Sequence, residues 1–193
     1  MKRLVFATRN VHKVAEVQEI LTKKHPILSL REVGYNGELP EEQQTLAGNA
    51  LQKARRVRRE LGANCFADDT GLEVDALDGA PGIHSARFAG EACDPEANTR
   101  ELLKRMQGAA RRDARFRCVI ALASNGREYL FEGSVEGEIL ESPRGTGGFG
   151  YDAVFRPAGY EESFAEMSPE LKNTISHRGM AVRELAQFLD SQH

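Results

Sequence analysis

Two adjacent acids, Asp68 and Asp69, form the part of the sequence best suited to chemistry. They are followed by Thr70 and Gly71 and preceded by a short apolar run, residues 64–67, which is typical of a buried strand. In α/β proteins, ligand-binding carboxylates are placed where a buried strand ends in a glycine turn. Acids are also common in solvated turns. The pair alone therefore leaves both interpretations open.

Lys13 is a second candidate, suited to binding an anion. Residues 3–7 read as a strand, and Asn10 is a suitable N-cap for a helix whose apolar stripe begins at Val14. Lys13 then falls in the first helical turn, where free backbone N–H groups and a full positive charge attract phosphate. The alternative is a plain strand–helix junction with a solvated lysine.

A glycine-rich segment, residues 145–152, offers another kind of binding surface. It reads GTGGFGYD and places four glycines in six residues ahead of an aromatic ring and an acid. Glycines let a backbone approach a ligand closely, and the ring of Phe149 is a flat face on which a base can stack. A glycine-rich hairpin that buries Phe149 is the alternative.

The start of the last helix carries two unusual residues, His177 and Arg178, directly after the capping residue Ser176. The helix macrodipole disfavours cations at this end. A local conflict of this kind is typical of a functional site.

The elements that position these residues alternate between strand and helix, which predicts an α/β fold. Apart from the strands at 3–7 and 64–67, strands are expected at residues 27–33, 116–122, 129–140 and 153–156, with Asn125-Gly126 as a hairpin turn. Apart from the first and last helices, helices are expected over residues 46–61, 95–106 and from 169 onwards. Lys53 and the arginines of residues 55–59 are interpreted as a solvated face, because no aromatic residues are interleaved. The arginines of residues 111–117 are interpreted as a second solvated surface.

The totals argue against several classes of protein. The chain has 193 residues and a net charge of −3, which argues against a general nucleic-acid binder. Its three cysteines form no CxxC pair, so neither a zinc site nor a disulfide framework is indicated. No apolar run approaches the length of a membrane span and no signal peptide is evident, so we expect a cytoplasmic protein with no membrane partner.

Five segments, taken together and in order, resemble the inosine triphosphate pyrophosphatase family, also called HAM1-like proteins. They are TRNVHK at residues 8–13, LPE at 39–41, ADDTGLEVDALDGAPGIHSARF at 67–88, GTGGFGYD at 145–152 and ISHRG at 175–179. The resemblance implies a long mixed β-sheet with flanking helices, in two lobes around a central substrate cleft. It also implies a single pyrophosphatase domain over residues 1–193 and a homodimer.

The activity that the resemblance implies is Mg²⁺-dependent hydrolysis of the non-standard purine triphosphates ITP, dITP and XTP to the monophosphate and pyrophosphate. Asp69 would be the catalytic group that activates water, and Glu41 and Asp69 would bind the metal. Glu42 stays open as the alternative to Glu41, because the segment EEQQTLAGNA departs from the usual family pattern. The residues expected to contact the substrate are Thr8, Asn10, Lys13, Thr70, Phe149, Gly150, Tyr151, Asp152, Lys172, His177 and Arg178.

Elementary chemistry agrees with these roles, since a triphosphate needs cations around it and magnesium prefers carboxylate oxygens. Two other classes of protein stay open. A regulatory module that binds a purine triphosphate without cleaving it fits less well, because carboxylates beside phosphates are unfavourable unless a metal bridges them. An RNA-binding protein that uses the arginine clusters fits the net charge of −3 poorly.

Overall fold

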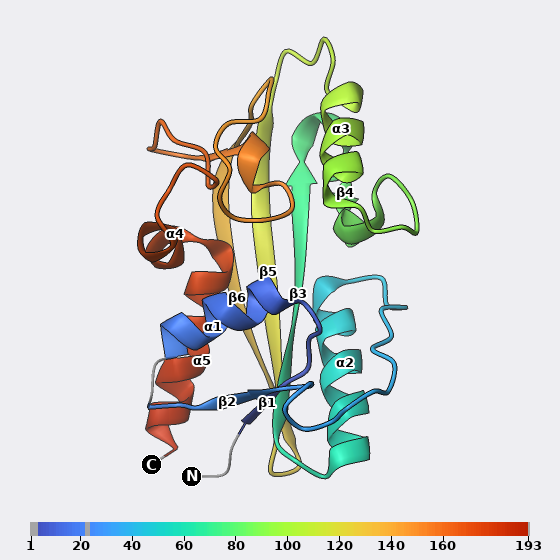
Figure 1. Cartoon of the computed structure of the whole chain (residues 1–193), viewed down its shortest axis with the longest axis vertical. Helices are drawn as coiled ribbons and strands as arrows, with labels where there is room; N and C mark the ends of the chain where they lie inside the picture. The colour runs from blue at the N-terminus through green and yellow to red at the C-terminus, as the bar shows by residue number, and fades with distance from the viewer. Residues whose placement is uncertain (1–3, 22–23, 193) are drawn as a thin grey trace. The chain divides into compact units, whose positions relative to one another are not determined.

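The computed structural model describes residues 4–21 and 24–192, which form a mixed sheet with flanking helices (Figure 1). The strands are β1 (Leu4–Phe6), β2 (Ile27–Ser29), β3 (Cys65–Val74), β4 (Pro81–Gly82), β5 (Asp113–Ser124), β6 (Arg127–Ile139) and β7 (Phe155–Pro157). The α-helices are α1 (Val11–Leu21), α2 (Leu46–Leu61), α3 (Pro95–Arg105), α4 (Pro169–Ile175) and α5 (His177–Ser191). Single 3₁₀ turns form at Asp75–Leu77, Ser85–Arg87 and Asp152–Val154.

The described strands form one seven-stranded sheet in the order β2-β1-β3-β5-β6-β7, with β4 paired to β3 outside this path. It is a mixed sheet, because β1 runs parallel to β2 and β3 whereas the β3–β4 and β6–β7 pairs are antiparallel. The expected α/β fold with a long mixed sheet is therefore confirmed.

Contacts within the chain divide it into two compact units. Unit 1 comprises Met1–Asp69, Cys118–Gly133 and Arg178–His193, and unit 2 comprises Thr70–Arg117 and Ser134–His177. The chain passes from one unit to the other between Asp69 and Thr70, inside the acidic segment.

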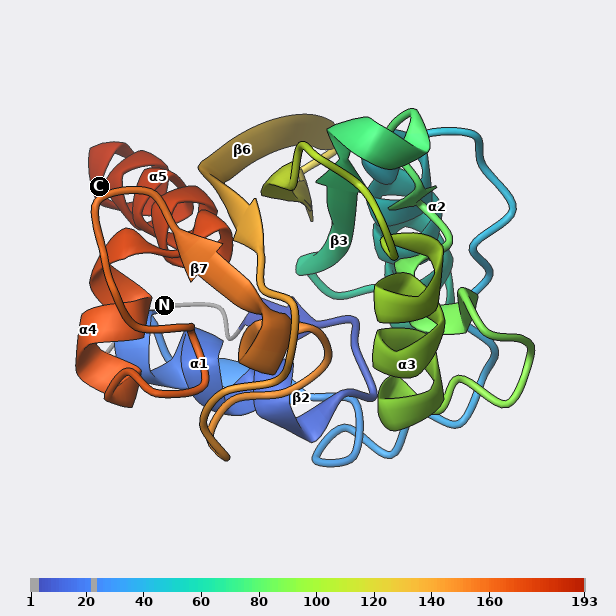
Figure 2. The ribbon, with the colours of Figure 1, turned by 90° about the horizontal axis from the view of Figure 1, so that it is seen from above.

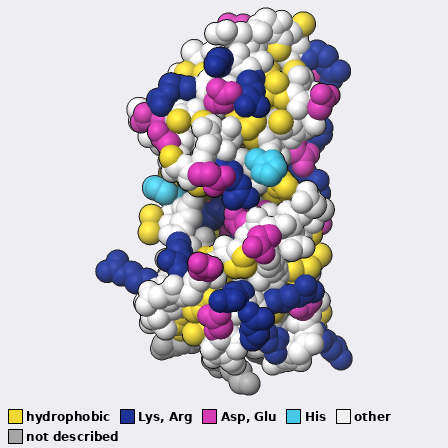
Figure 3. All heavy atoms as spheres, turned by 90° about the vertical axis from the view of Figure 1, so that its right-hand side faces the viewer, with side chains coloured by type: hydrophobic (Ala, Val, Ile, Leu, Met, Phe, Trp, Pro, Cys, Tyr) yellow, Lys and Arg dark blue, Asp and Glu magenta, His cyan; other side chains and the backbone are white. Residues whose placement is uncertain are grey.

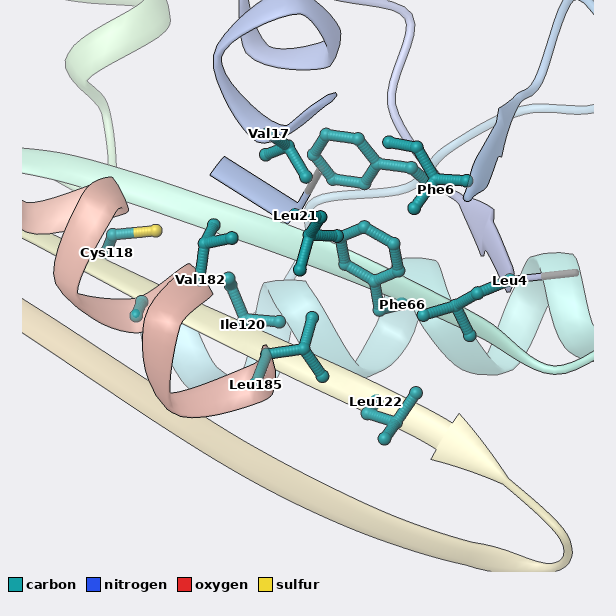
Figure 4. Close-up of a cluster of buried hydrophobic side chains, with 12 residues drawn as sticks. Leu4, Phe6, Val17, Leu21, Phe66, Cys118, Ile120, Leu122, Val182 and Leu185 are labelled. Atoms are coloured by element: carbon teal, nitrogen blue, oxygen red, sulfur yellow. The ribbon is translucent and has the colours of Figure 1, made fainter. Parts of the chain in front are cut away.

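Unit 1 is a three-layer arrangement in which α1 and α5 cover one face of the strands and α2 covers the other (Figure 1). Strand alternation produces the two faces. Leu4 and Phe6 of β1 join the apolar cluster under α1 and α5, whereas Val5 and Ala7 join the cluster under α2. Figure 4 shows the first cluster, in which the rings of Phe6 and Phe66 stack with centroids 4.4 Å apart.

The ends of the helices follow the sequence signals. Asn10 Oδ1 accepts hydrogen bonds from the backbone N–H groups of His12 and Lys13, so it caps α1 as expected. Gly62 ends α2 in the left-handed conformation, with φ of 63°. These caps fix where α1 begins and therefore where Lys13 lies.

Unit 2 has its own apolar core, built between α3, the outer parts of β3, β5 and β6, and the segment around β7. Leu102 and Met106 enter it from the region of α3, and Phe155 and Phe164 enter it from the β7 region. In Figures 1 and 2, α3 and α4 lie on opposite sides of the strands of this unit.

Three expectations about strands were wrong. The strand predicted over residues 27–33 stops at Ser29, because the Glu32 carboxylate accepts hydrogen bonds from Ser29 N at 2.8 Å and Ser29 Oγ at 2.6 Å and holds a turn. The strand predicted over residues 153–156 begins as a 3₁₀ turn and is extended only from Phe155. The acidic pair lies inside β3 and not in a turn after it.

β3 continues through its glycine because a neighbouring backbone requires close approach. A Cβ atom at Gly71 would lie 2.7 Å from the carbonyl oxygen of Gly82 in β4, the strand that pairs with this part of β3. The glycine that suggested a turn therefore serves strand pairing.

The arginine clusters are largely compensated by acids. Arg55 forms a two-pronged pair with Glu128 at 2.7 Å, and Arg115 binds Asp75 at 2.7 Å. Arg112 is not a solvated residue as predicted, since its guanidinium donates to the carbonyl oxygens of Met106 and Leu140 at 3.2 and 2.9 Å. Figure 3 shows basic and acidic side chains interspersed on one face of the molecule.

Among the described residues, no helix is long and apolar enough to span a bilayer.

Candidate active site

Asp68 and Asp69 are both buried, and the alternation of β3 directs them to opposite faces of the sheet. Asp68 is 1% exposed and Asp69 is 7% exposed. Asp68 shares the face of Phe66, under α1 and α5, whereas Asp69 shares the face of Ala67, under α2. The solvated-turn interpretation of the pair is therefore excluded.

Asp68 forms ion pairs with two cationic side chains, Lys13 and Arg178. Lys13 Nζ, from the first turn of α1, lies 3.1 Å from Asp68 Oδ1 and 3.0 Å from Oδ2. Arg178 Nε, from the first turn of α5, donates to Asp68 Oδ2 at 3.1 Å. Burial alone would raise the pKa of Asp68, but the charges of Lys13, Arg178 and Lys53 outweigh it and hold the pKa well below its usual range. Asp68 is therefore a fixed anion.

Asp69 has different partners. Lys53 Nζ, from the middle of α2, donates to Asp69 Oδ1 at 2.9 Å, and Asn49 Nδ2 donates to Asp69 Oδ2 at 3.2 Å. Each oxygen of the Asp69 carboxylate is thereby held by a different residue, and these two residues, Asn49 and Lys53, lie one turn apart on α2. Burial raises the pKa of Asp69, although the charge of Lys53 opposes the rise. A carboxylate with a raised pKa is the better proton acceptor of the two.

Glu41 lies beside this second group. Its Oε1 accepts from Lys53 Nζ at 2.5 Å, so Glu41 and Asp69 converge on one ammonium. Glu42 instead accepts from Gln52 Nε2 at 2.9 Å and is exposed. This geometry favours Glu41 over Glu42 as the second acid, which the sequence left open.

The carboxylate oxygens around Lys53 Nζ are of the type that binds a hard divalent cation. Two carboxylate oxygens from Glu41 and Asp69 already converge on a single positive charge, and oxygen ligands are those that Mg²⁺ prefers. In the part of the chain that the structure describes, no group of three or more His, Cys, Asp or Glu residues could hold a metal. A metal bound here would therefore need ligands from water or substrate in addition to these two residues.

Lys53 and Asn49 were missed by the sequence analysis. Lys53 was assigned to a solvated face with its neighbouring arginines, which is wrong, because it is 4% exposed and paired with two acids. The signal was available in the helix periodicity. Lys53 lies three positions after Ala50 and four before Val57, and Asn49 lies three positions after Leu46, so both are on the buried side of α2.

Unit 2 gathers most of the residues expected to hold the base. Asp152 Oδ2 accepts from Lys172 Nζ at 2.7 Å and from the backbone N–H of Phe149 at 2.7 Å. Lys172 Nζ also lies 5.0 Å from the centre of the Phe149 ring. Gly148 has φ of 68°, and a Cβ there would collide with the Asp152 carboxylate, so glycine is required at this position.

Other expected substrate residues of unit 2 differ in exposure. His177 is buried and stacks on Phe116 with centroids 4.6 Å apart. Tyr151 is also buried, and its hydroxyl donates a hydrogen bond to the carbonyl oxygen of Ser85 at 2.8 Å. This hydrogen bond connects the glycine-rich segment to the 3₁₀ turn at Ser85–Arg87. Thr70 is half-buried in β3, and Gly150 is exposed with φ of 63°.

The expected substrate residues of unit 1 are Thr8, Asn10, Lys13 and Arg178. Thr8 Oγ1 accepts from the backbone N–H of Asn10 at 3.2 Å, so the two residues together form the turn before α1. Arg178, expected to contact the nucleotide with its neighbour His177, lies with the Asp68 group of unit 1.

A cavity of about 340 Å³ lies elsewhere in unit 1 and is lined by residues such as His25, Asn64 and Phe188. None of its lining residues belongs to the expected site. Its described lining residues contain no cluster of charged side chains suited to a triphosphate.

The chain belongs to the Ham1 family, whose model matches residues 4–188. It is 52% identical to the dITP/XTP pyrophosphatase of Porphyromonas gingivalis, over 98% of each chain. It is 35% identical to the Staphylococcus aureus Ham1 protein, whose solved structure superimposes with a TM-score of 0.90 over 100% of both chains. A Ham1 protein from Coxiella burnetii is 36% identical, with a TM-score of 0.90 over 99% of this chain and 100% of that one. The predicted family is therefore confirmed.

Proposed function

We propose that this protein hydrolyses non-standard purine nucleoside triphosphates, namely ITP, dITP and XTP, to the monophosphate and pyrophosphate. Family membership and the dITP/XTP pyrophosphatase relatives support the reaction. The observation that carries it is the placement of two adjacent buried acids against different partners, Asp68 beside Lys13 and Arg178 and Asp69 beside Lys53 and Asn49.

Asp69 is the group that we assign to activating water. Lys53 and Asn49 hold its two oxygens, so its remaining lone pairs have a defined direction. A carboxylate fixed in this way can orient a water molecule and accept its proton as the bond to the α-phosphorus forms. The ammonium of Lys53 stays charged, because Asp69, Glu41 and Asp68 together outweigh the effect of its burial and raise its pKa.

Glu41 and Asp69 are the residues that we expect to hold Mg²⁺. When bound, the ion would neutralise charge on the phosphates and favour departure of pyrophosphate. This role also explains why carboxylates would be placed beside a polyanion.

Lys13 is the residue that we assign to the phosphates, with Thr8 and Asn10 shaping the turn before it. The backbone N–H groups of His12 and Lys13 are already used by the Asn10 side chain. The ammonium of Lys13 is therefore expected to contribute more to phosphate binding than the first N–H groups of the helix.

Base selection is assigned to the unit 2 group of Phe149, Asp152, Lys172 and His177. The Phe149 ring can stack on any base, so selection requires polar groups at the base edge. Hypoxanthine and xanthine present a 6-oxo acceptor and an N1–H donor, whereas adenine presents the reverse pattern. A charged donor such as Lys172 and an acceptor such as Asp152 match the oxo bases, and the mismatched base would leave buried groups unpaired.

We further propose that the protein acts as a homodimer in the cytoplasm, where the nucleotide pool that it would clean is held. The reaction is tested with a panel of nucleoside triphosphates and Mg²⁺, measuring monophosphate and pyrophosphate. Release of pyrophosphate from ITP, dITP and XTP, far above release from ATP, is expected. Binding of these nucleotides without release of pyrophosphate would instead indicate a regulatory module.

A further inference from the structure

We propose that Glu16 is a positioning residue for the reaction, which acts through Arg178 and Asp68 on the phosphate-binding Lys13. The inference rests on the proposed function, because it concerns how Lys13 is made available to a triphosphate. No motif in the sequence pointed to Glu16.

Four side chains of unit 1 form a chain of alternating charge, Lys13–Asp68–Arg178–Glu16, that begins and ends on α1. Lys13 and Glu16 are three positions apart on α1, so they lie on the same side of this helix. Lys13 Nζ contacts Asp68 Oδ2 at 3.0 Å, and Arg178 Nε donates to the same oxygen at 3.1 Å. Arg178 Nη1 donates to Glu16 Oε2 at 2.5 Å, so the chain of contacts returns to α1 at Glu16.

Burial makes the Glu16 charge necessary. The side chain of Arg178 is 3% exposed and that of Asp68 is 1% exposed, whereas Glu16 and Lys13 are 15% and 16% exposed. A buried guanidinium requires nearby anions, and without Glu16 the single carboxylate of Asp68 would be shared by two cations. With Glu16 present, Arg178 has a counter-charge of its own.

This arrangement has a consequence for Lys13. When a triphosphate binds, the ammonium of Lys13 must be shared between Asp68 and phosphate. Asp68 then keeps Arg178 as a partner, and Glu16 keeps Arg178 from turning towards the phosphate. Glu16 thus separates two cations that would otherwise compete for one acid.

Loss of the Glu16 charge should therefore change binding and turnover in opposite directions. The group becomes one unit more positive, which strengthens binding of an anion. Lys13 and Arg178 are less well placed, and misplacement of a group by about 1 Å can lower a rate by about 10²-fold. A merely structural role would not strengthen anion binding.

The test compares Glu16→Gln with Glu19→Gln, which removes the same charge from an exposed position of the same helix. We measure kcat and KM for dITP and, separately, calorimetric binding of inorganic pyrophosphate. For Glu16→Gln we expect kcat to fall by about 10–100-fold, with an unchanged or lower KM and a lower Kd for pyrophosphate. Glu19→Gln should match the wild type in all three values.

Glu16→Asp retains the charge on a shorter side chain and should recover part of the kcat of wild type, and it serves if Glu16→Gln does not fold. Equal kcat and pyrophosphate affinity in Glu16→Gln and Glu19→Gln would overturn the inference. So would weaker pyrophosphate binding in Glu16→Gln, or a Glu16→Asp variant no better than a folded Glu16→Gln. Absence of dITP hydrolysis by the wild type would instead reject the proposed function.

Discussion

Asp68 and Asp69 are adjacent in the chain, yet β3 directs them to opposite faces of the sheet and to different cations. Asp68 meets Lys13 and Arg178, whereas Asp69 meets Lys53. This separation lets one acid stay charged as part of a fixed ion-pair group while the other is available to accept a proton.

Removal of divalent metal should abolish activity. Glu41 and Asp69 supply two hard oxygen donors, and the described residues contain no cluster suited to a softer metal. We expect pyrophosphate release from dITP to stop in excess EDTA and to return with Mg²⁺. Zn²⁺ should restore little activity, since cysteine and histidine are not grouped for it. Full turnover in EDTA would contradict the metal assignment.

Lys13→Ala should weaken handling of the triphosphate without changing the choice of base. Lys13 belongs to unit 1 and contacts Asp68, whereas the base-selecting residues belong to unit 2. We expect kcat/KM to fall for ITP and ATP by similar factors. An altered ITP to ATP ratio with unchanged absolute values would show that Lys13 does not act on the phosphates.

Asp68→Asn should destabilise the protein strongly, because it leaves Lys13 and Arg178 without their shared anion. Breaking a buried ion pair from one side costs about 3–5 kcal/mol, which urea unfolding measures. The pKa of Asp68 is lowered in the folded state, so its contribution is present above the ordinary carboxyl pKa of about 3.9 and is lost as the pH falls towards the lowered value. The difference in unfolding free energy between wild type and Asp68→Asn should therefore shrink below about pH 4; a constant difference would contradict this account.

Lys172→Met should reduce selection between bases, whereas Phe149→Ala should weaken the binding of ITP and ATP by similar factors. Lys172 is buried, is held by Asp152 at 2.7 Å and carries the donor suited to a 6-oxo group. A site built to hydrogen-bond its substrate can reject the wrong pattern by about 10⁴-fold. We expect the ratio of kcat/KM for ITP over ATP to fall in Lys172→Met and to stay near the wild-type value in Phe149→Ala. A lower ratio in Phe149→Ala together with an unchanged ratio in Lys172→Met would instead assign base selection to the Phe149 ring.

Much of the fold could be predicted from the sequence, because caps and periodicity are local signals. Asn10, Gly62 and the Asn125-Gly126 turn each fixed an element end where the structure has one. The surroundings of the acidic pair could not be predicted in the same way. Whether Asp68-Asp69-Thr70-Gly71 is a turn or a strand depends on the neighbours of β3 in the sheet, among them β5 and β4, which are formed by residues further along the chain.

The sequence predicted many residues of the candidate site, but it did not predict which of them form ion pairs with one another. Local rules suggested Lys13 as an anion binder, and the family resemblance supplied Asp69 and Glu41. Neither showed that Lys53 would be buried between Glu41 and Asp69. Charge alone suggested a solvated lysine, whereas the apolar periodicity of α2 places Lys53 on the buried side of the helix and the packing of α2 shows which acids it meets there.

The most direct test of the assignment is the rate of pyrophosphate release from dITP by Asp69→Asn, measured beside the wild type at saturating Mg²⁺. The amide is nearly isosteric, so an unchanged circular dichroism spectrum serves as the control for folding. The account predicts that kcat falls by at least about 10²–10⁴-fold, the range of a general base. Wild-type turnover in Asp69→Asn, with unchanged dependence on Mg²⁺, would contradict the account and make Asp68 the candidate.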